Sequence, residues 1–330
     1  MPTTRRVFAV LTLLSASLLT PAALAQQATP APKPATTQPT QAEKPALYDE
    51  SAVATEQIAA ALAKAKKENR RVLIQWGGNW CGWCIKLDEH IRSDRDLRRK
   101  LLYEYDVVHI DIGRFDKNIE LASSLGADLK ANGVPFLTVL DADGKPIANQ
   151  ETGALEAADD PDASHDSTKL MAFLTEHQAE YMSASAILDD ALAQARDEDK
   201  LAFVHFGAPW CSWCHRLEAF LAREDVIEVL GDHFIDVKID TDRTIGGGDM
   251  LSEMRKSQRG GIPWFAFLDP DGEIVTHSSE RGQNIGYPAA PDEADVFLEM
   301  LGKTKRDITE AQLEFLKTEL VNSLKPRADQ

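Results

Sequence analysis

Four cysteines form two closely spaced pairs, and they are the residues of this chain best suited to chemistry. The pairs lie in Trp80-Cys81-Gly82-Trp83-Cys84 and in Trp210-Cys211-Ser212-Trp213-Cys214. Two cysteines three positions apart fall on one face of a helix, close enough to form a disulfide. At the start of a helix, unpaired N–H groups and the helix dipole favour a negative charge on the first sulfur.

This placement predicts different roles for the two members of each pair. Cys81 and Cys211 are expected to be the nucleophilic thiolates. Cys84 and Cys214 lie one turn deeper, where they are shielded and can resolve a mixed disulfide. The chemistry would be thiol–disulfide exchange, which needs no cofactor beyond the thiols.

Two other uses of the cysteines compete with this interpretation. Two C-x-x-C pairs provide four thiolates, which is a zinc ligand set, but here 126 residues separate the pairs and no metal is expected. Alternatively, both pairs are inert structural disulfides. A bridge that closes so short a loop removes little chain entropy, which makes it a weak structural device.

The sequence around each pair recurs 130 residues later. Positions 61–87 and 191–217 align without a gap and share 11 of 27 residues. Further along, Val134-Pro135-Phe136 corresponds to Ile262-Pro263-Trp264. A repeat of this length indicates a tandem duplication of a domain rather than a solenoid, whose units are shorter.

Each copy predicts the same order of elements, with strands and helices in alternation and a final hairpin. The first helix, first strand, second strand and last helix are expected at 55–69, 72–76, 107–112 and 167–181, and again at 184–199, 201–206, 234–239 and 294–302. This order predicts an α/β fold in which helices flank a mixed central sheet. A further amphipathic helix at 308–324 is expected to pack on the second copy.

Both copies resemble thioredoxin-fold domains, over residues 55–175 and 185–302. The two W-C-x-x-C motifs match the active site of that family, and Pro135 and Pro263 match its cis-proline. The resemblance implies the disulfides Cys81–Cys84 and Cys211–Cys214, with the two prolines facing them. It also implies that Val134 and Ile262 offer backbone groups to a bound peptide.

The sequence departs from thioredoxin behind the cysteines. Thioredoxin has a buried aspartate six residues before the first cysteine, where this chain has Gln75 and His205. Glutamine cannot take a proton but histidine can, so His205 is a candidate base for Cys214. The structural alternative is a hydrogen-bonded core histidine. The residues between the cysteines also differ, so the family's reduction potential cannot be carried over.

The tryptophans gather around the cysteine motifs and predict a binding surface. All six lie there: Trp76, Trp80, Trp83, Trp210, Trp213 and Trp264. A wide apolar rim suits an unfolded protein, and substrate contacts are assigned to Trp80, Trp83, Trp210 and Trp213. The expected partners are protein substrates with thiols or disulfides and an unidentified redox partner.

The net charge and the N-terminal segment indicate which partners and which cellular compartment to expect. The 330 residues include 36 Lys and Arg against 53 Asp and Glu, a net charge of −17, which argues against nucleic-acid binding. Arg5 and Arg6, an apolar run at 7–19 and Ala23-Leu24-Ala25 predict a signal peptide cleaved after Ala25. The run is shorter than the ~20 residues of a membrane span, so none is expected after cleavage.

The sequence therefore predicts a periplasmic or secreted thiol–disulfide oxidoreductase with two catalytic domains. The expected parts are a signal peptide at 1–25, a Pro/Thr/Ala/Gln-rich linker at 26–50, thioredoxin-like domains at 51–181 and 182–306, and a C-terminal helix and tail at 307–330. Reductase, oxidant and isomerase directions all remain open. The alternative is a non-catalytic thioredoxin-fold binding or scaffold module whose C-x-x-C pairs are structural disulfides.

Overall fold

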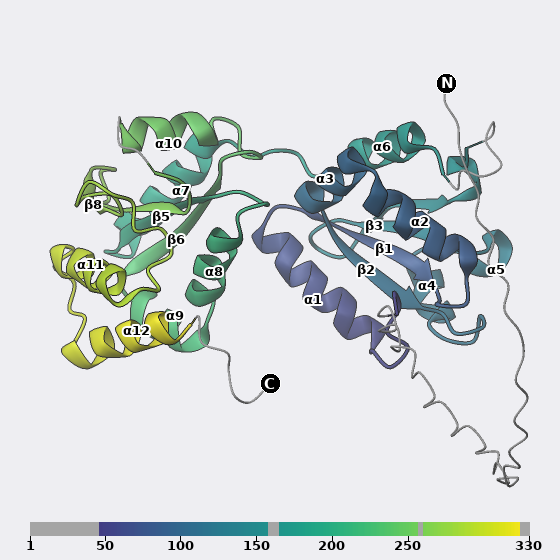
Figure 1. Ribbon diagram of the computed structural model, residues 1–330, viewed down its shortest axis with the longest axis horizontal. Coiled ribbons are helices and arrows are strands. Elements are labelled where there is room, and N and C mark those ends of the chain that lie inside the picture. The colour runs from purple at the N-terminus through teal and green to yellow at the C-terminus, as the bar shows by residue number, and fades with distance from the viewer. Residues whose placement is uncertain (1–45, 158–164, 257–259, 324–330) are drawn as a thin grey trace, which may run out of the picture. The chain divides into compact units, whose positions relative to one another are not determined.

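Two mixed four-stranded sheets organise the computed structural model, which describes residues 46–157, 165–256 and 260–323. Their strand orders are β2-β1-β3-β4 and β6-β5-β7-β8 (Figure 1). In each sheet the first pair of strands is parallel and the other two pairs are antiparallel. The predicted signal peptide and most of the predicted linker lie outside the described residues.

The N-terminal sheet is built around a strand that is buried on both faces. Its strands are β1 (Arg71–Gly77), β2 (Tyr105–Asp111), β3 (Phe136–Leu140) and β4 (Pro146–Glu151). Gln75 of β1 pairs with His109 of β2 on one side and with Leu137 of β3 on the other. A central strand that is covered on both faces reads as a nearly continuous apolar run, as β1 does.

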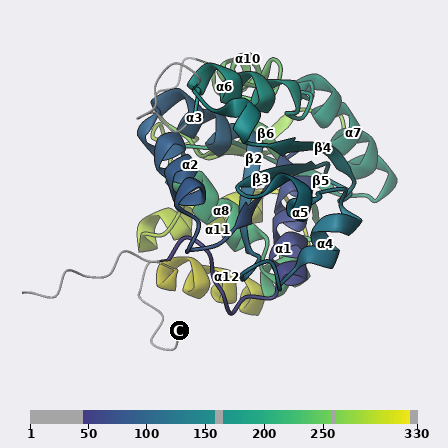
Figure 2. The ribbon, with the colours of Figure 1, turned by 90° about the vertical axis from the view of Figure 1, so that its right-hand side faces the viewer.

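Helices cover both faces of this sheet. They are α1 (Ala54–Lys67), α2 (Gly82–Ser93), α3 (Arg95–Glu104), α4 (Ile119–Ser124), α5 (Leu129–Asn132) and α6 (Ser167–Glu176), with a short 3-10 helix at Gly153–Leu155. Alternate residues of β1 (Val72, Ile74, Trp76) pack in the cluster that includes α1, α4 and α5. Leu73 packs with residues of α2, α3 and α6. These helices lie on the other face of the sheet (Figures 1 and 2). The face toward α2 is therefore the one that Gln75 and Gly77 share.

The C-terminal sheet repeats this plan. Its strands are β5 (Leu201–Gly207), β6 (Phe234–Asp240), β7 (Trp264–Leu268) and β8 (Ile274–His277), and its helices are α7 (Ala184–Asp197), α8 (Ser212–Leu221), α9 (Glu224–Leu230), α10 (Gly247–Arg255), α11 (Pro291–Lys303) and α12 (Glu310–Asn322). Val204 and Phe206 pack with α7 and α10, whereas Phe203 packs with α8, α9, α11 and α12. The central strand again ends at a glycine just before a cysteine pair.

The mixed α/β architecture expected from the sequence is confirmed, with two helices added. Helices α3 and α9, which were not among the elements expected from the sequence, lie between each cysteine helix and the second strand. Asp94 separates α2 from α3. Its backbone is extended, and its carboxylate accepts hydrogen bonds from the N–H groups of Asp96 and Leu97 at 2.9 and 3.1 Å. An N-cap of this kind starts a new helix.

Helix α12 packs where the sequence predicted. Leu316 and Leu320 are fully buried in the same cluster as Phe297 of α11. Thr309 begins the helix by accepting the N–H of Gln312, whose side chain in turn accepts the Thr309 N–H. Leu324, the last residue of the predicted helix, lies outside the described residues. In the described ranges, no helix has the length and apolar character needed to cross a membrane.

We expect Leu316→Ala to destabilise the C-terminal half by about 2–4 kcal/mol, because it leaves a cavity in a closed cluster. Urea unfolding followed by far-UV circular dichroism measures this. Thr318→Ala, on the exposed face of the same helix, is the matched control and should cost less than about 0.5 kcal/mol. Equal effects from the two variants would contradict the packing described for α12.

Candidate active sites

In both halves, the chain leaves the central strand and turns directly into a helix whose N-cap is a cysteine. Cys81 caps α2, and the N–H of Cys84 donates to its Sγ at 3.1 Å. Cys211 caps α8 in the same way, accepting from Cys214 at 3.1 Å. A sulfur that accepts an N–H at a helix N-terminus is stabilised as a thiolate.

The sulfurs of each pair are bonded to one another. Cys81 is joined to Cys84, and Cys211 to Cys214, with 5.2 Å between the Cα atoms of each pair. We call the surroundings of the first disulfide site 1 and those of the second site 2. Among the described residues, no cluster of three or more His, Cys, Asp or Glu side chains could hold a metal ion.

A cis X-Pro peptide lies against the first cysteine at both sites. Val134–Pro135 and Ile262–Pro263 are the two cis bonds found in the described ranges. The Val134 carbonyl oxygen is 3.7 Å from Cys81 Sγ, and that of Ile262 is 3.6 Å from Cys211 Sγ. The structure therefore brings the cysteines and the predicted prolines together.

Only four of the six tryptophans form an exposed rim. Trp80 and Trp83 at site 1 are 37% and 42% exposed, and Trp210 and Trp213 at site 2 are 59% and 48% exposed. Cationic groups lie over three of these rings, namely Arg114 over Trp80, Lys86 over Trp83 and Arg216 over Trp213.

The inclusion of Trp76 and Trp264 in an apolar rim is wrong. Both are fully buried, because they point to the sheet face opposite the cysteine helix, toward α1 and α7. Each indole N–H is satisfied inside the core, by Thr138 at 2.9 Å and by Ser279 at 3.1 Å. These two residues support the strands and present no surface to a substrate.

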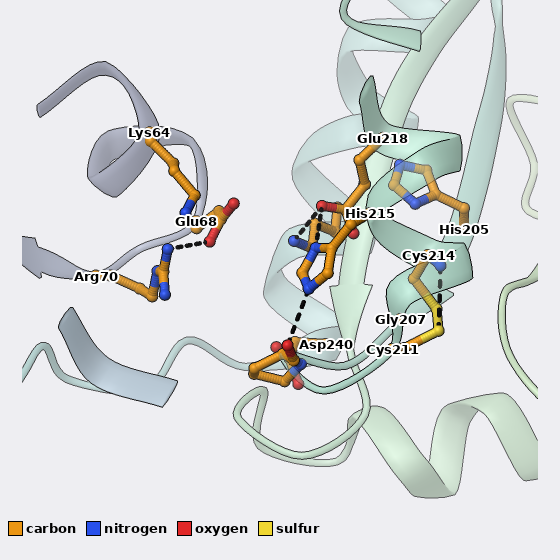
Figure 3. A network of polar contacts seen from close by, with 12 residues as sticks. Lys64, Glu68, Arg70, His205, Gly207, Cys211, Cys214, His215, Glu218 and Asp240 are labelled. Carbon is orange, nitrogen blue, oxygen red and sulfur yellow. Dashed lines mark hydrogen bonds and ion pairs between the residues drawn. A yellow bond between two sulfur atoms is a disulfide. The ribbon is translucent and has the colours of Figure 1, made fainter. Parts of the chain in front are cut away.

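Behind site 2 lies a charged cluster that the sequence analysis did not single out (Figure 3). Glu218 of α8 is buried and is paired with Lys238 at 2.9 Å, and its Oε2 is 3.6 Å from Nδ1 of His215. Glu218 Oε1 and Cys214 Sγ lie 3.4 and 3.5 Å from the point that a Cβ on Gly207 would occupy, so the two atoms are less than 7 Å apart. The sequence spacing could have indicated Glu218, because it follows Cys214 by one helical turn and therefore lies on the same face of the helix.

His205, the candidate base, is buried on β5 and is hydrogen-bonded through Nε2 to Asp236 at 2.9 Å. It shares with Gly207 the sheet face that packs on α8, as the sequence position required. Its role as a base for Cys214 stays a prediction. Glu218 is a carboxylate, like the buried aspartate of thioredoxin, but the helix supplies it rather than the strand.

Site 1 has different groups behind its disulfide. Gln75 donates from Nε2 to the phenol oxygen of Tyr48 at 2.7 Å and to the Cys84 carbonyl at 3.2 Å. Tyr48 precedes α1 and is fully buried beside both cysteines. Asp88, in the helix position of Glu218, pairs instead with Arg92 at 2.9 Å. Burial lowers the pKa of the neighbouring His109, which outweighs the opposite effect of Asp88.

His165 packs against the exposed face of site 1. Its ring meets Trp83 edge-on, with 5.9 Å between the ring centroids, and it is only 2% exposed. Neither ring nitrogen has a hydrogen-bond partner among the described residues. Burial, with a smaller contribution from His90, lowers the pKa of His165 to about 4. This histidine is therefore neutral at pH 7 and acts as an apolar neighbour of Trp83.

Family comparisons agree with this geometry. A family model described as "Thioredoxin-like domain" matches residues 58–163. This segment of the chain is therefore similar to thioredoxin-like domains. A second model, Thioredox_DsbH, described as "Protein of unknown function, DUF255", matches residues 165–319. The thioredoxin-like match contains the cysteines and proline of site 1, and the second match contains those of site 2.

Two curated relatives and one solved structure each match less than half of the chain. "Uncharacterized protein B0495.5" of Caenorhabditis elegans is 30% identical over 108 residues, which are 30% of this chain and 15% of that protein. "Disulfide bond reductase DsbH" of Chlamydia pneumoniae is 28% identical over 98 residues, 28% of this chain and 59% of that protein. A solved disulphide isomerase from Xylella fastidiosa Temecula1 is 32% identical, with 39% of this chain and 95% of that one covered and a TM-score of 0.35.

The matched segments thus span 15% and 59% of the two curated relatives. Similarity over these segments alone does not assign the activity of either relative to this chain. The cysteines, the cis prolines and the thioredoxin-like match together support the general class of thiol–disulfide oxidoreductase.

We expect stability to fall as the pH drops from about 6.5 toward 4, because the unfolded chain protonates His165 before the folded chain does. The stabilisation is complete above pH 6.5, and its loss amounts to at most about 3 kcal/mol. Urea unfolding at pH 7 and pH 4.5 measures it. His165→Phe should show a smaller pH dependence than wild type, and His177→Asn, at the end of α6, should not. A wild-type pH dependence in the His165 variant would refute this assignment.

Proposed function

We propose that the chain is a thiol–disulfide oxidoreductase with two tandem thioredoxin-like domains, at 51–181 and 182–306. Each domain would act on protein disulfides through its own dithiol, in the periplasm or outside the cell. The observation that carries this proposal is the repeated arrangement of a cysteine N-cap beside the carbonyl of a cis X-Pro peptide. A purely structural disulfide has no need of either neighbour.

In the reducing direction, the step begins with both cysteines of a site as thiols. The Cys81 thiolate attacks one sulfur of a substrate disulfide, and the other substrate sulfur leaves as a thiolate and takes up the proton that Cys81 has lost. The Cys84 thiolate then attacks Cys81 Sγ and releases the second substrate thiolate, which takes up the proton of Cys84. Two electrons and two protons have passed to the substrate, and the Cys81–Cys84 disulfide remains. The oxidising direction is the reverse.

At site 2 the resolving thiol has an acid–base partner. Cys214 must lose its proton before it attacks Cys211, and Glu218 lies less than 7 Å away with Lys238 and His215 on its other oxygen. One water molecule would bridge such a gap. Glu218 would accept the proton through that water and would return it in the opposite direction.

The substrate would lie across the exposed rim. Trp80 and Trp83 at site 1, and Trp210 and Trp213 at site 2, offer apolar platforms to an unfolded chain. The carbonyls of Val134 and Ile262, next to the nucleophilic sulfurs, would accept N–H groups from an extended peptide. The similarity of a segment to a protein called a disulfide bond reductase supports protein disulfides as the substrate class.

The decisive experiment is insulin reduction with dithiothreitol as the electron donor, using paired Cys→Ser variants. We expect Cys81→Ser/Cys84→Ser and Cys211→Ser/Cys214→Ser each to retain activity from the intact site. The variant with all four serines should lose it by at least about 100-fold, because no thiolate remains to attack.

A peptide-binding assay with the same proteins separates the alternative function. Trp83→Ala and Trp213→Ala should weaken binding of an unfolded peptide, and the four-serine variant should still bind. If wild type shows no exchange while tryptophan-dependent binding persists, the chain is a binding module and the oxidoreductase proposal fails. Trp264 is unsuitable for this test because it is a core residue.

We expect Glu218→Gln to slow the resolving step at site 2 by tenfold or more, because the amide cannot accept the Cys214 proton. The measurement is the decay rate of a mixed disulfide with glutathione, in the Cys81→Ser/Cys84→Ser background so that only site 2 reports. Glu228→Gln, exposed on α9, is the matched control. A decay rate unchanged by Glu218→Gln at pH 6 to 8 would remove Glu218 from the mechanism.

A further inference from the structure

Site 1 is completed by a residue that comes from outside the strand–helix unit. Tyr48 lies in the segment before α1, and Asn79, in the turn between β1 and α2, holds its backbone at both ends. The Tyr48 N–H donates to Asn79 Oδ1 at 3.0 Å, and Asn79 Nδ2 donates to the Tyr48 carbonyl at 2.8 Å. The same amide reaches Glu50, whose carbonyl also accepts from Lys117 at 3.1 Å. The segment is thereby fastened to the turn that carries Cys81.

The hydroxyl group of Tyr48 lies beside the sulfur of Cys84. Tyr48 Oη and Cys84 Sγ lie 2.5 and 2.6 Å from the point that a Cβ on Gly77 would occupy, so they are about 5 Å apart at most. Gly77 leaves open the space in which the two groups meet. Tyr48, Cys81 and Cys84 form a single buried cluster, and the tyrosine ring also meets His109 edge-on at 5.5 Å.

The Tyr48 hydroxyl already accepts one hydrogen bond and can still donate one. Gln75 Nε2 donates to Tyr48 Oη at 2.7 Å, so the oxygen is already an acceptor and its own hydrogen remains to be donated. Burial raises the pKa of Tyr48 above its ordinary value, with Asp88 and Asp111 adding to the effect and the Gln75 bond opposing it. The phenol therefore keeps its proton throughout the range in which thiols exchange.

We propose that Tyr48 donates a hydrogen bond to the Cys84 sulfur when the Cys81–Cys84 disulfide is open, and that it thereby stabilises the reduced form of site 1. This deepens the proposed function and rests on it. A disulfide sulfur is a poor acceptor, whereas the Cys84 sulfur of the open dithiol accepts a hydrogen bond, most strongly as the thiolate that resolves the mixed disulfide, so the bond favours the reduced state. Site 1 is consequently a stronger oxidant than it would be without the phenol.

Site 2 lacks this device. The atoms nearest the corresponding point at Gly207 belong to Cys214 and Glu218, with no phenol among them. A carboxylate near the resolving sulfur repels a thiolate, whereas a neutral O–H donor attracts one. The two sites are therefore tuned in opposite directions by the group that fills the same place.

The test is the reduction potential of site 1 in the Cys211→Ser/Cys214→Ser background, by equilibration with glutathione and thiol trapping. Tyr48→Phe should raise the equilibrium constant for oxidation of the dithiol by about tenfold, which is about 30 mV toward a more reducing potential. Tyr105→Phe is the matched control, because Tyr105 is also buried but its O–H donates to the Leu174 carbonyl, in a separate core cluster. It should leave the potential unchanged.

A second variant covers the case in which Tyr48→Phe does not fold. Replacing Tyr48 with 3-fluorotyrosine keeps the shape and makes the O–H a stronger donor, so the potential should move the other way, toward oxidant. A merely structural tyrosine would not produce this reversal. An unchanged potential in the folded variants, or an equal shift in Tyr105→Phe, overturns the proposal. Insulin reduction by wild type is measured separately, so failure of the proposed function is distinguishable from failure of this inference.

Discussion

The hydrogen bond from the second cysteine's N–H to the first cysteine's sulfur is the constraint on which both sites depend. It forms only if the first cysteine is the N-cap of its helix, and that requires the preceding strand to end one short turn earlier. β1 and β5 satisfy this by being central strands, each held on both sides by a neighbouring strand. The burial of the central strand thus sets the position of the first sulfur in each pair.

A glycine at the end of each central strand then decides what reaches the resolving sulfur. A Cβ at Gly77 would be 2.6 Å from Cys84 Sγ, and one at Gly207 would be 3.1 Å from Cys214 Cβ. A side chain at Gly77 would clash and one at Gly207 would be crowded, so the two glycines let neighbouring groups approach the disulfides closely. These groups differ between the halves, with a neutral phenol and amide in one and an ion pair in the other. Similar backbones can therefore support dithiols of different chemistry.

Much of this arrangement was accessible from the sequence, because the signals were local or repeated. The cysteine spacing, the X-Pro pairs and the alternation of apolar strands with helices are each short-range patterns, and each of them occurs twice in the sequence. The core was harder to assign. Trp76 and Trp264 stand near the motifs in sequence, but strand alternation turns them to the opposite face, which composition alone does not reveal.

What the sequence could not supply was contact between distant segments. Tyr48 is separated from Cys84 by all of α1 and β1, and no motif near Tyr48 in the sequence indicates that it packs beside the two cysteines. Glu218 carried a periodic signal, yet its importance depends on Lys238, which a separate strand provides. The groups proposed to tune the two dithiols lie beside the glycines that end the central strands. Their identity therefore follows from packing, and two sites that share a motif need not share a potential.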